Sequence, residues 1–297
     1  NIARDWLRPT YARDVSVDIA EMAQYVNEEF GGVRSVWRMG GNWTTIRQLV
    51  ASGFPVIIET SVQVTGQGSG WAGHNRLIIG YDGNDILTFD SYLGNGSGNG
   101  LRYPQEEIDE LWRQMNRNFM VIYPIERENE VAYIIGEDWN IANNIDHAHR
   151  VALAEMRANP SNIFAGFNLG TTYIALGQYE EAVTAYDAAF EAGRNTRGGI
   201  PFRIFWYQFG VFDAYYHVGR YDEVIYQARA ALENMAGNGA EEVYYWLGMG
   251  YAGRGEFDRA KAQFENALAF NPRYKPAEDA LQQIITGTYK PPVVMSN

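Results

Sequence analysis

The sequence contains no cysteine and only three lysines among its 297 residues. The absence of cysteine excludes disulfides and thiolate metal sites. Arginine carries almost all the positive charge, and the net charge of −12 divides into −4 over residues 1–125 and −8 over the remainder. Because neither part is basic, we expect no binding to nucleic acid or to anionic membrane surfaces. No apolar run approaches the roughly 20 residues that span a bilayer.

What is present suits a folded protein with more than one core. The chain is 46% hydrophobic and 14% aromatic, and its length predicts two domains at roughly 150 residues each. The chain starts at Asn1, without Met, inside a segment of helical pattern. We therefore expect a fragment whose front, together with any targeting segment, has been removed.

Residues 1–125 mix helical periodicity with alternating strand patterns. The expected elements are helices over 14–29, 42–52 and 104–115, strands over 55–62 and 118–123, and a hairpin over 74–90 that turns at 82–84. Gly-rich loops are expected over 63–73 and 93–100, on either side of the hairpin. Helices followed by antiparallel strands predict an α+β domain.

Residues 126–297 are predicted to be helical and repetitive. Three segments align on Gly177, Gly219 and Gly255, and they share small and aromatic residues at equal spacings. Such positions include Leu169-Gly170, Tyr173, Tyr186, Tyr215, Tyr221, Ala228, Tyr244, Leu247-Gly248, Tyr251, Phe264 and Pro272. A period near 34 residues with this pattern is typical of tetratricopeptide repeats. We expect repeats near 163–196, 205–238 and 241–274, and a capping helix over 274–287; the alternative is a helical bundle without repeats.

Small residues at these spacings let antiparallel helices approach, and aromatic residues fill the space between hairpins. In tetratricopeptide arrays the first helix of each hairpin lines a concave groove. Five aromatic residues are candidates to line it and to bind an extended peptide or a protein partner. They are Phe167, Trp206, Phe209, Tyr216 and Tyr245. The competing interpretation is that each of them packs between repeats.

The most informative polar pair is His74 at the start of the hairpin and Asp90 at its end. Residues paired across a hairpin lie close together, so these two are candidates to be neighbours. An imidazole oriented by a carboxylate is the base half of a hydrolase triad. The nucleophile is missing, because the chain has no Cys and the nearby Ser69 and Ser91 are poor substitutes.

Residues 1–125 resemble the papain-like, double-glycine-peptidase-related (bacteriocin-processing-like) family of bacterial cysteine peptidases. The matching stretches are Asp14-Val15-Ser16, Glu21-Met22-Ala23-Gln24-Tyr25-Val26, Gly53-Phe54-Pro55-Val56-Ile57-Ile58, Gly73-His74, Gly80-Tyr81-Asp82 and Phe89-Asp90-Ser91. The resemblance implies an antiparallel sheet with helices, a His base and an Asp that orients it. His74 and Asp90 take these two roles, while the family's Cys and its upstream Gln have no counterpart in this chain.

The resemblance implies peptide hydrolysis or acyl transfer on a peptide or protein substrate in an intact protein, with this chain inactive by itself. It also implies a location outside the cytoplasm or at a membrane, through an anchor preceding Asn1. A second hypothesis is a pseudo-enzyme that binds peptides without cleaving them, and a third is a scaffold in which His74 and Asp90 are structural. No cofactor or metal is predicted, because His147 and His149 are two residues apart on a helix and point to different faces.

Overall fold

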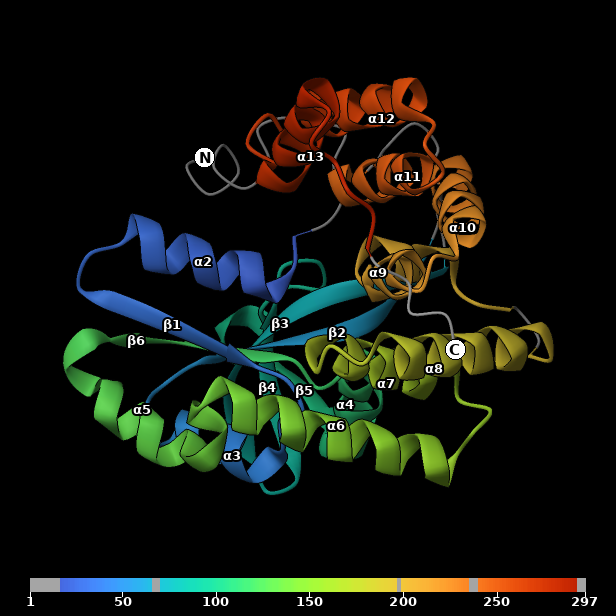
Figure 1. Ribbon diagram of the computed structural model, residues 1–297. Coiled ribbons are helices and arrows are strands. Elements are labelled where there is room, and N and C mark those ends of the chain that lie inside the picture. Colours follow the sequence, from blue (N-terminus) through green and yellow to red (C-terminus); the bar gives the residue numbers. More distant parts are fainter. Residues whose placement is uncertain (1–16, 66–69, 197–198, 235–239, 293–297) are drawn as a thin grey trace. The chain divides into compact units, whose positions relative to one another are not determined.

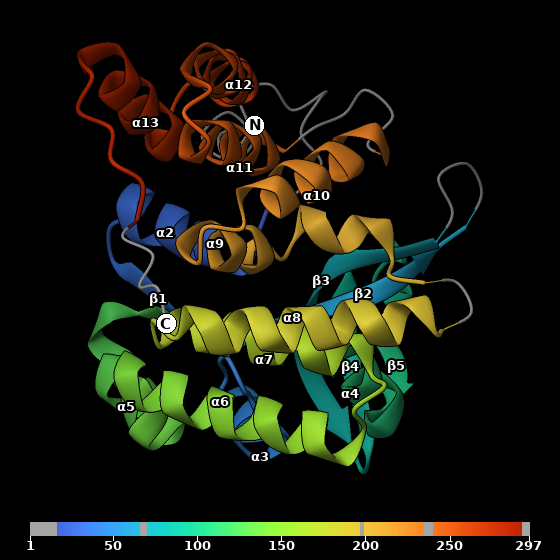
Figure 2. The same cartoon turned by 45° about the vertical axis from the view of Figure 1, so that its right-hand side comes forward.

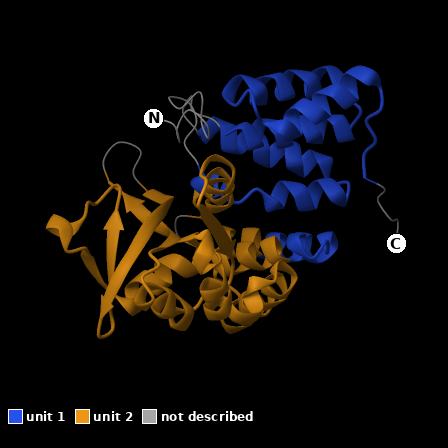
Figure 3. Ribbon diagram, turned by 90° about the vertical axis from the view of Figure 1, so that its left-hand side faces the viewer, with its two compact units in different colours: residues 1–17, 173–188, 202–297 blue, residues 18–172, 189–201 orange. Residues whose placement is uncertain are grey.

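The computed structural model describes residues 17–65, 70–196, 199–234 and 240–292. The expected start of the first helix at Asp14, and Ser69, lie outside these residues. Two compact units are distinguished in Figure 3, one formed by residues 18–172 and 189–201, the other by residues 1–17, 173–188 and 202–297. The unit drawn in orange contains the sheet, and the unit drawn in blue contains most of the helical repeats.

The sheet has six antiparallel strands in the order β1-β6-β2-β3-β4-β5 (Figure 1). Their bounds are β1 Val33–Arg38, β2 Val56–Val64, β3 Gly70–Asp82, β4 Asp85–Asp90, β5 Leu101–Pro104 and β6 Phe119–Pro124. The central hairpin of β3 and β4 turns at Gly83-Asn84, as its Asp-Gly-Asn sequence predicts.

The two faces of the sheet are covered by different helices. Helices α3 (Trp43–Ala51), α4 (Gln105–Arg113) and α5 (Glu128–Ile135) contribute to the larger core together with Val56 and Ile58 of β2. Helix α2 (Ile19–Glu29) contributes Ile19 and Ala23 to a smaller cluster that includes Ile57. Successive residues of a strand point to opposite faces of the sheet. Because helices cover both faces, β2 carries apolar residues on both of its sides.

The sheet differs from the expected one in two places. Strands β1 and β5 were not expected, because each is short and carries arginine. They form strands because β1 pairs with β6 and β5 pairs with β4. The loop expected over 63–73 was also wrong in part. Strand β2 continues to Val64 and β3 begins at Gly70, because the two strands pair as far as Val64 and Gly70 in spite of their Gly-rich and polar sequence.

The unit with the sheet extends beyond residue 125. Helix α6 (Ile141–Ala158) is tied to the end of β1 by Asn144, which is fully buried. The Asn144 side chain accepts from the Met39 backbone N–H at 3.1 Å and donates to the Met39 carbonyl at 2.8 Å. This explains why α6 and most of α7 (Ile163–Ala175) belong to the same compact unit as the sheet.

The remaining helices follow the paired pattern of the repeats. They are α8 Tyr179–Arg194, α9 Gly210–His217, α10 Tyr221–Asn234, α11 Glu241–Gly253, α12 Phe257–Phe270 and α13 Lys275–Thr286. Figure 2 shows α11, α12 and α13 packed against one another. The aligned glycines Gly177, Gly219 and Gly255 all have left-handed φ angles of 71°, 78° and 76° in the turns between helices. Glycine adopts this conformation without the steric clash that a β-carbon would introduce.

The close approach of α11 and α12 depends on Gly248. A β-carbon at this position would lie 2.5 Å from Cε1 of Phe264, which is fully buried. We therefore expect Gly248→Ala to destabilise the helical unit by about 1–3 kcal/mol, although alanine favours helices. Chemical unfolding followed by circular dichroism measures this loss. Gly31→Ala is the matched control, since nothing lies within 4 Å of its β-carbon position, and equal midpoints for the two variants would contradict the expectation.

Candidate functional site

The structure brings His74 and Asp90 together at the mouth of the β3–β4 hairpin. Nε2 of His74 lies 2.8 Å from Oδ1 of Asp90, and their side chains are 14% and 0% exposed. The strand register places Arg76, and not His74, directly opposite Asp90. His74 therefore reaches Asp90 diagonally, two residues along the same face of β3.

Asp90 is a buried carboxylate surrounded by donors. Its Oδ1 accepts hydrogen bonds from the backbone N–H groups of Tyr92 at 2.8 Å and Leu93 at 2.7 Å, in addition to His74. Burial by itself raises the pKa of Asp90, but the Leu93 N–H, the His74 ring and the Tyr92 N–H together hold that pKa below its usual value. The carboxyl group is therefore ionised near neutral pH and acts only as an acceptor.

Arg76 is the residue that the sequence analysis missed. Its Nε lies 3.1 Å from Oδ2 of Asp90, and the Arg76 side chain is 2% exposed. Nη1 of Arg76 donates to the Thr60 hydroxyl and to the Ser61 carbonyl on β2. The Thr60 hydroxyl donates to the His74 carbonyl at 3.1 Å. Strand alternation was the available signal, because Arg76 is two residues from His74 and shares its face.

The geometry also settles which nitrogen of His74 is available. An ionised carboxylate can only accept a hydrogen bond. Nε2 of His74 therefore carries the proton and donates it in the hydrogen bond to Asp90. Within the described part of the chain, no residue hydrogen-bonds to Nδ1 of His74. The lone pair on Nδ1 is therefore the one that can take a proton from a nucleophile.

A cavity of about 400 Å³ borders the same strands on the other side of the sheet. Its apolar lining includes Met22 of α2, Ile57 of β2, Leu77 of β3 and Phe89 of β4. Alternation places Leu77 and Phe89 on the face of the sheet opposite to the His74 ring. The cavity and the His74 ring therefore lie on opposite faces of the sheet.

Glu59 is a second buried acid beside the pair. It lies on β2 opposite Asn75, is 4% exposed, and accepts a hydrogen bond from Nδ2 of Asn118 at 2.8 Å. Burial raises the pKa of Glu59 to about 7, more than the Asn118 hydrogen bond lowers it. Because the folded-state value exceeds the usual 4.5, Glu59 lowers stability progressively as the pH rises from about 4.5 to about 7.

We expect Glu59→Gln to stabilise the protein above about pH 7, by up to about 3 kcal/mol, because glutamine never charges in the buried position. Below pH 4.5 the variant and the parent should be equally stable, since Glu59 is then protonated in both the folded and the unfolded state. Urea unfolding on both sides of this range measures the difference. Glu126→Gln, at an exposed position, is the control, and a gain that does not depend on pH would refute the assignment.

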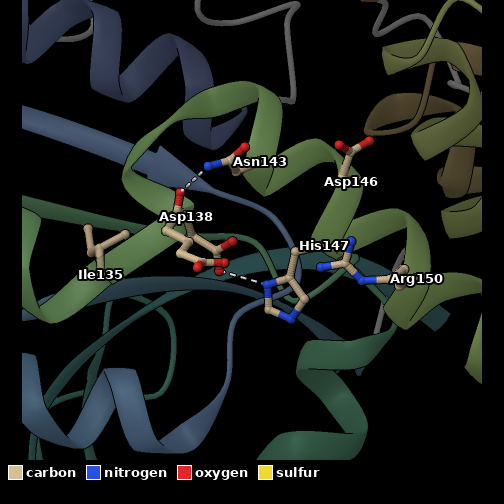
Figure 4. A pocket seen from close by; sticks show the side chains of 7 residues that line it. Ile135, Asp138, Asn143, Asp146, His147 and Arg150 are labelled. Carbon is tan, nitrogen blue, oxygen red and sulfur yellow. Dashed lines mark hydrogen bonds and ion pairs between the residues drawn. The ribbon is translucent and has the colours of Figure 1, made fainter.

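The other histidines have separate partners. Nδ1 of His147 lies 2.7 Å from Oδ2 of Asp138, in a polar cavity of about 570 Å³ that Figure 4 shows. Nδ1 of His149 lies 3.2 Å from the Thr172 hydroxyl, and burial lowers the pKa of His149. His147 and His149 therefore contact different groups. His217 stacks on Tyr179 with ring centres 3.9 Å apart and pairs with Asp213.

The five aromatic residues considered for a peptide groove are placed as follows. Phe167, Trp206 and Tyr216 are buried, and Phe209 and Tyr245 are half-buried. Tyr216 and Tyr245 both contact the ring of Trp246, with ring centres 6.0 and 5.1 Å apart. Burial raises the pKa of Tyr245 to about 12. A binding role for the five remains a prediction, and Phe209 and Tyr245 keep the most accessible surface of the set.

These features define an antiparallel α+β domain with an oriented imidazole, followed by paired helices. Residues 6–120 match the Peptidase_C39 like family, and residues 167–195 and 241–274 each match a tetratricopeptide repeat model. The chain thus contains a Peptidase_C39-like domain at its N-terminal side followed by two tetratricopeptide repeats, as the sequence resemblance implies. A comparison with curated protein sequences finds no match.

Several solved structures are similar to the helical part of the chain. MamA is 20% identical over 52% of this chain and 84% of its own, with a TM-score of 0.41. A thermophilic TPR protein of Thermus thermophilus is 16% identical over 55% and 84%, with a TM-score of 0.38. YrrB, a TPR protein with an unusual peptide-binding site, is 17% identical over 56% and 83%, also at 0.38. Similarity this low carries no argument about what this chain binds. None of the described helices is long and apolar enough to cross a membrane.

Proposed function

We propose that the Peptidase_C39-like domain handles peptide acyl groups, by hydrolysis or transfer, with His74 as general base and Asp90 as the group that orients it. The observation that carries the proposal is the 2.8 Å contact between His74 Nε2 and the fully buried Asp90 carboxylate. This contact uses Nε2 and leaves Nδ1 of His74 without a hydrogen-bond partner among the described residues. A base held by a carboxylate in this way is the arrangement that activates a thiol or hydroxyl nucleophile.

The chemistry requires a thiol that these 297 residues do not contain. In the proposed reaction, Nδ1 of His74 takes the proton of that thiol, and the thiolate attacks the carbonyl carbon of the peptide. The amine leaves with the proton returned from the imidazolium, and the acyl group remains on sulfur. Water, or another amine, then releases the acyl group by the same proton transfers in reverse order. Asp90 stays ionised throughout and holds the ring.

The repeats supply the second part of the proposal, which is the binding of a peptide or protein partner. We also propose that the two domains comprise residues 1–125 and 126–297. The repeats lie near residues 163–196, 205–238 and 241–274. Half-buried Phe209 and Tyr245 suit such contacts, because aromatic residues gain large contact area at low entropic cost. A partner held by the repeats would raise the local concentration of its peptide near the first domain.

A second candidate function is favoured by the absence of cysteine. In a pseudo-peptidase, the same domain binds a peptide and the repeats bind a partner, with no bond broken. The two functions differ in whether a thiol is ever brought to Nδ1 of His74.

The deciding experiment extends the chain by the coding sequence that precedes Asn1 and measures turnover of a peptide thioester probe. If that segment supplies a thiol, we expect turnover, and His74→Ala should reduce it by at least about 100-fold, since general-base catalysis is worth that much. His147→Ala is the matched control, because His147 pairs with Asp138 elsewhere in the fold and should leave turnover unchanged.

Turnover that survives His74→Ala would reject His74 as the base. If the extended protein shows no turnover but the chain binds peptide in calorimetry, the pseudo-peptidase is the correct description. Loss of binding in Tyr245→Ala, with circular dichroism unchanged, would then place the partner on the repeats.

A further inference from the structure

The Asp90 carboxylate is shared between two basic side chains. Oδ1 faces Nε2 of His74 at 2.8 Å, and Oδ2 faces Nε of Arg76 at 3.1 Å. Asp90 is 0% exposed and Arg76 is 2% exposed, so water screens neither charge effectively. The guanidinium cannot lose its proton near neutral pH, whereas the imidazole can.

We propose that Arg76 is a positioning residue for His74. Its guanidinium forms an ion pair with Oδ2 of Asp90 and offsets the negative charge of Asp90. The His74 ring is then held in place by its contact with Oδ1 and still remains neutral. This inference rests on the proposed function, because a general base must be neutral to accept a proton.

The charge balance gives the reason. With Arg76 present, Asp90 is already neutralised, and a protonated His74 ring would leave one net positive charge in a buried site. Without Arg76, the same protonated ring would neutralise Asp90 and would be favoured. Asp90 acts on the His74 ring in two ways. Its hydrogen bond orients the ring, and its negative charge favours the protonated form of the ring. Arg76 leaves the hydrogen bond intact and cancels most of the charge effect.

The guanidinium is itself held by β2. Thr60 and Ser61 accept hydrogen bonds from its Nη1, while its Nε faces Asp90 on β4. A planar fork can bridge two strands in this way, but an ammonium cannot. The other titratable groups near this network are the phenols of Tyr92, whose ring centre is 6.4 Å from the His74 ring, and of Tyr103, whose ring centre is 5.8 Å from the Arg76 guanidinium.

The experiment is a histidine NMR titration of the chain as it is, which needs no nucleophile. The ring protons of the four histidines are followed against pH in the parent, Arg76→Gln, Arg76→Lys and Arg102→Gln. In Arg76→Gln we expect the ratio of protonated to neutral His74 rings at a given pH to rise by about tenfold. Arg76→Lys keeps the cation but loses the fork, and should give a smaller rise of about two- to threefold.

Arg102→Gln is the matched control, since Arg102 pairs with Asp82 and Asp85 at the surface and should leave the His74 ratio unchanged. An unchanged ratio in Arg76→Gln would overturn the proposal. If Arg76→Gln does not fold, Arg76→Met, which also removes the charge, takes its place, and an unchanged ratio there overturns the proposal equally. Because no turnover is measured, a rise in the ratio supports Arg76 even if the thioester experiment later shows no catalysis by His74.

Discussion

The structure around the hairpin depends on one buried carboxylate. Asp90 ends β4 at a point where two backbone N–H groups, an imidazole and a guanidinium converge on its two oxygens. A buried charge is costly unless it is paired. The hydrogen bonds to Oδ1 and the charge of the Arg76 guanidinium, 3.1 Å from Oδ2, therefore both favour the ionised form of Asp90. The same requirement fixes the orientation of His74, because the ring is one of the groups that satisfies Asp90.

The rest of the unit that contains the sheet holds these strands in register. Cores on both faces bury β2, and β2 in turn presents the Thr60 hydroxyl and the Ser61 carbonyl to Arg76. Glu59, on the opposite face of β2, has a pKa raised to about 7, which reflects the cost of building polar groups into an apolar sheet. The helical unit is built differently, from pairs of helices that approach each other at small residues such as Gly248. Its stability is therefore distributed over the repeats.

The combination of the two parts limits what the protein does. A Peptidase_C39-like domain and tetratricopeptide repeats are present in one chain, and the proposal of peptide chemistry with a protein partner rests on this combination. In that proposal the imidazole of His74 is the base, and whether a thiol is brought to it decides between catalysis and binding.

The sequence by itself determined two of the repeats, the α+β character of residues 1–125 and the proximity of His74 and Asp90. These features rest on local patterns, namely glycines in turns, helical spacing and strand alternation. Such patterns can be recognised in the sequence without knowing the tertiary contacts. It did not determine β1 and β5, because short charged strands exist only through their pairing partners. Only the tertiary structure decided that Arg76 stands opposite Asp90 and that Glu59 is buried, since register and burial arise when strands distant in sequence meet.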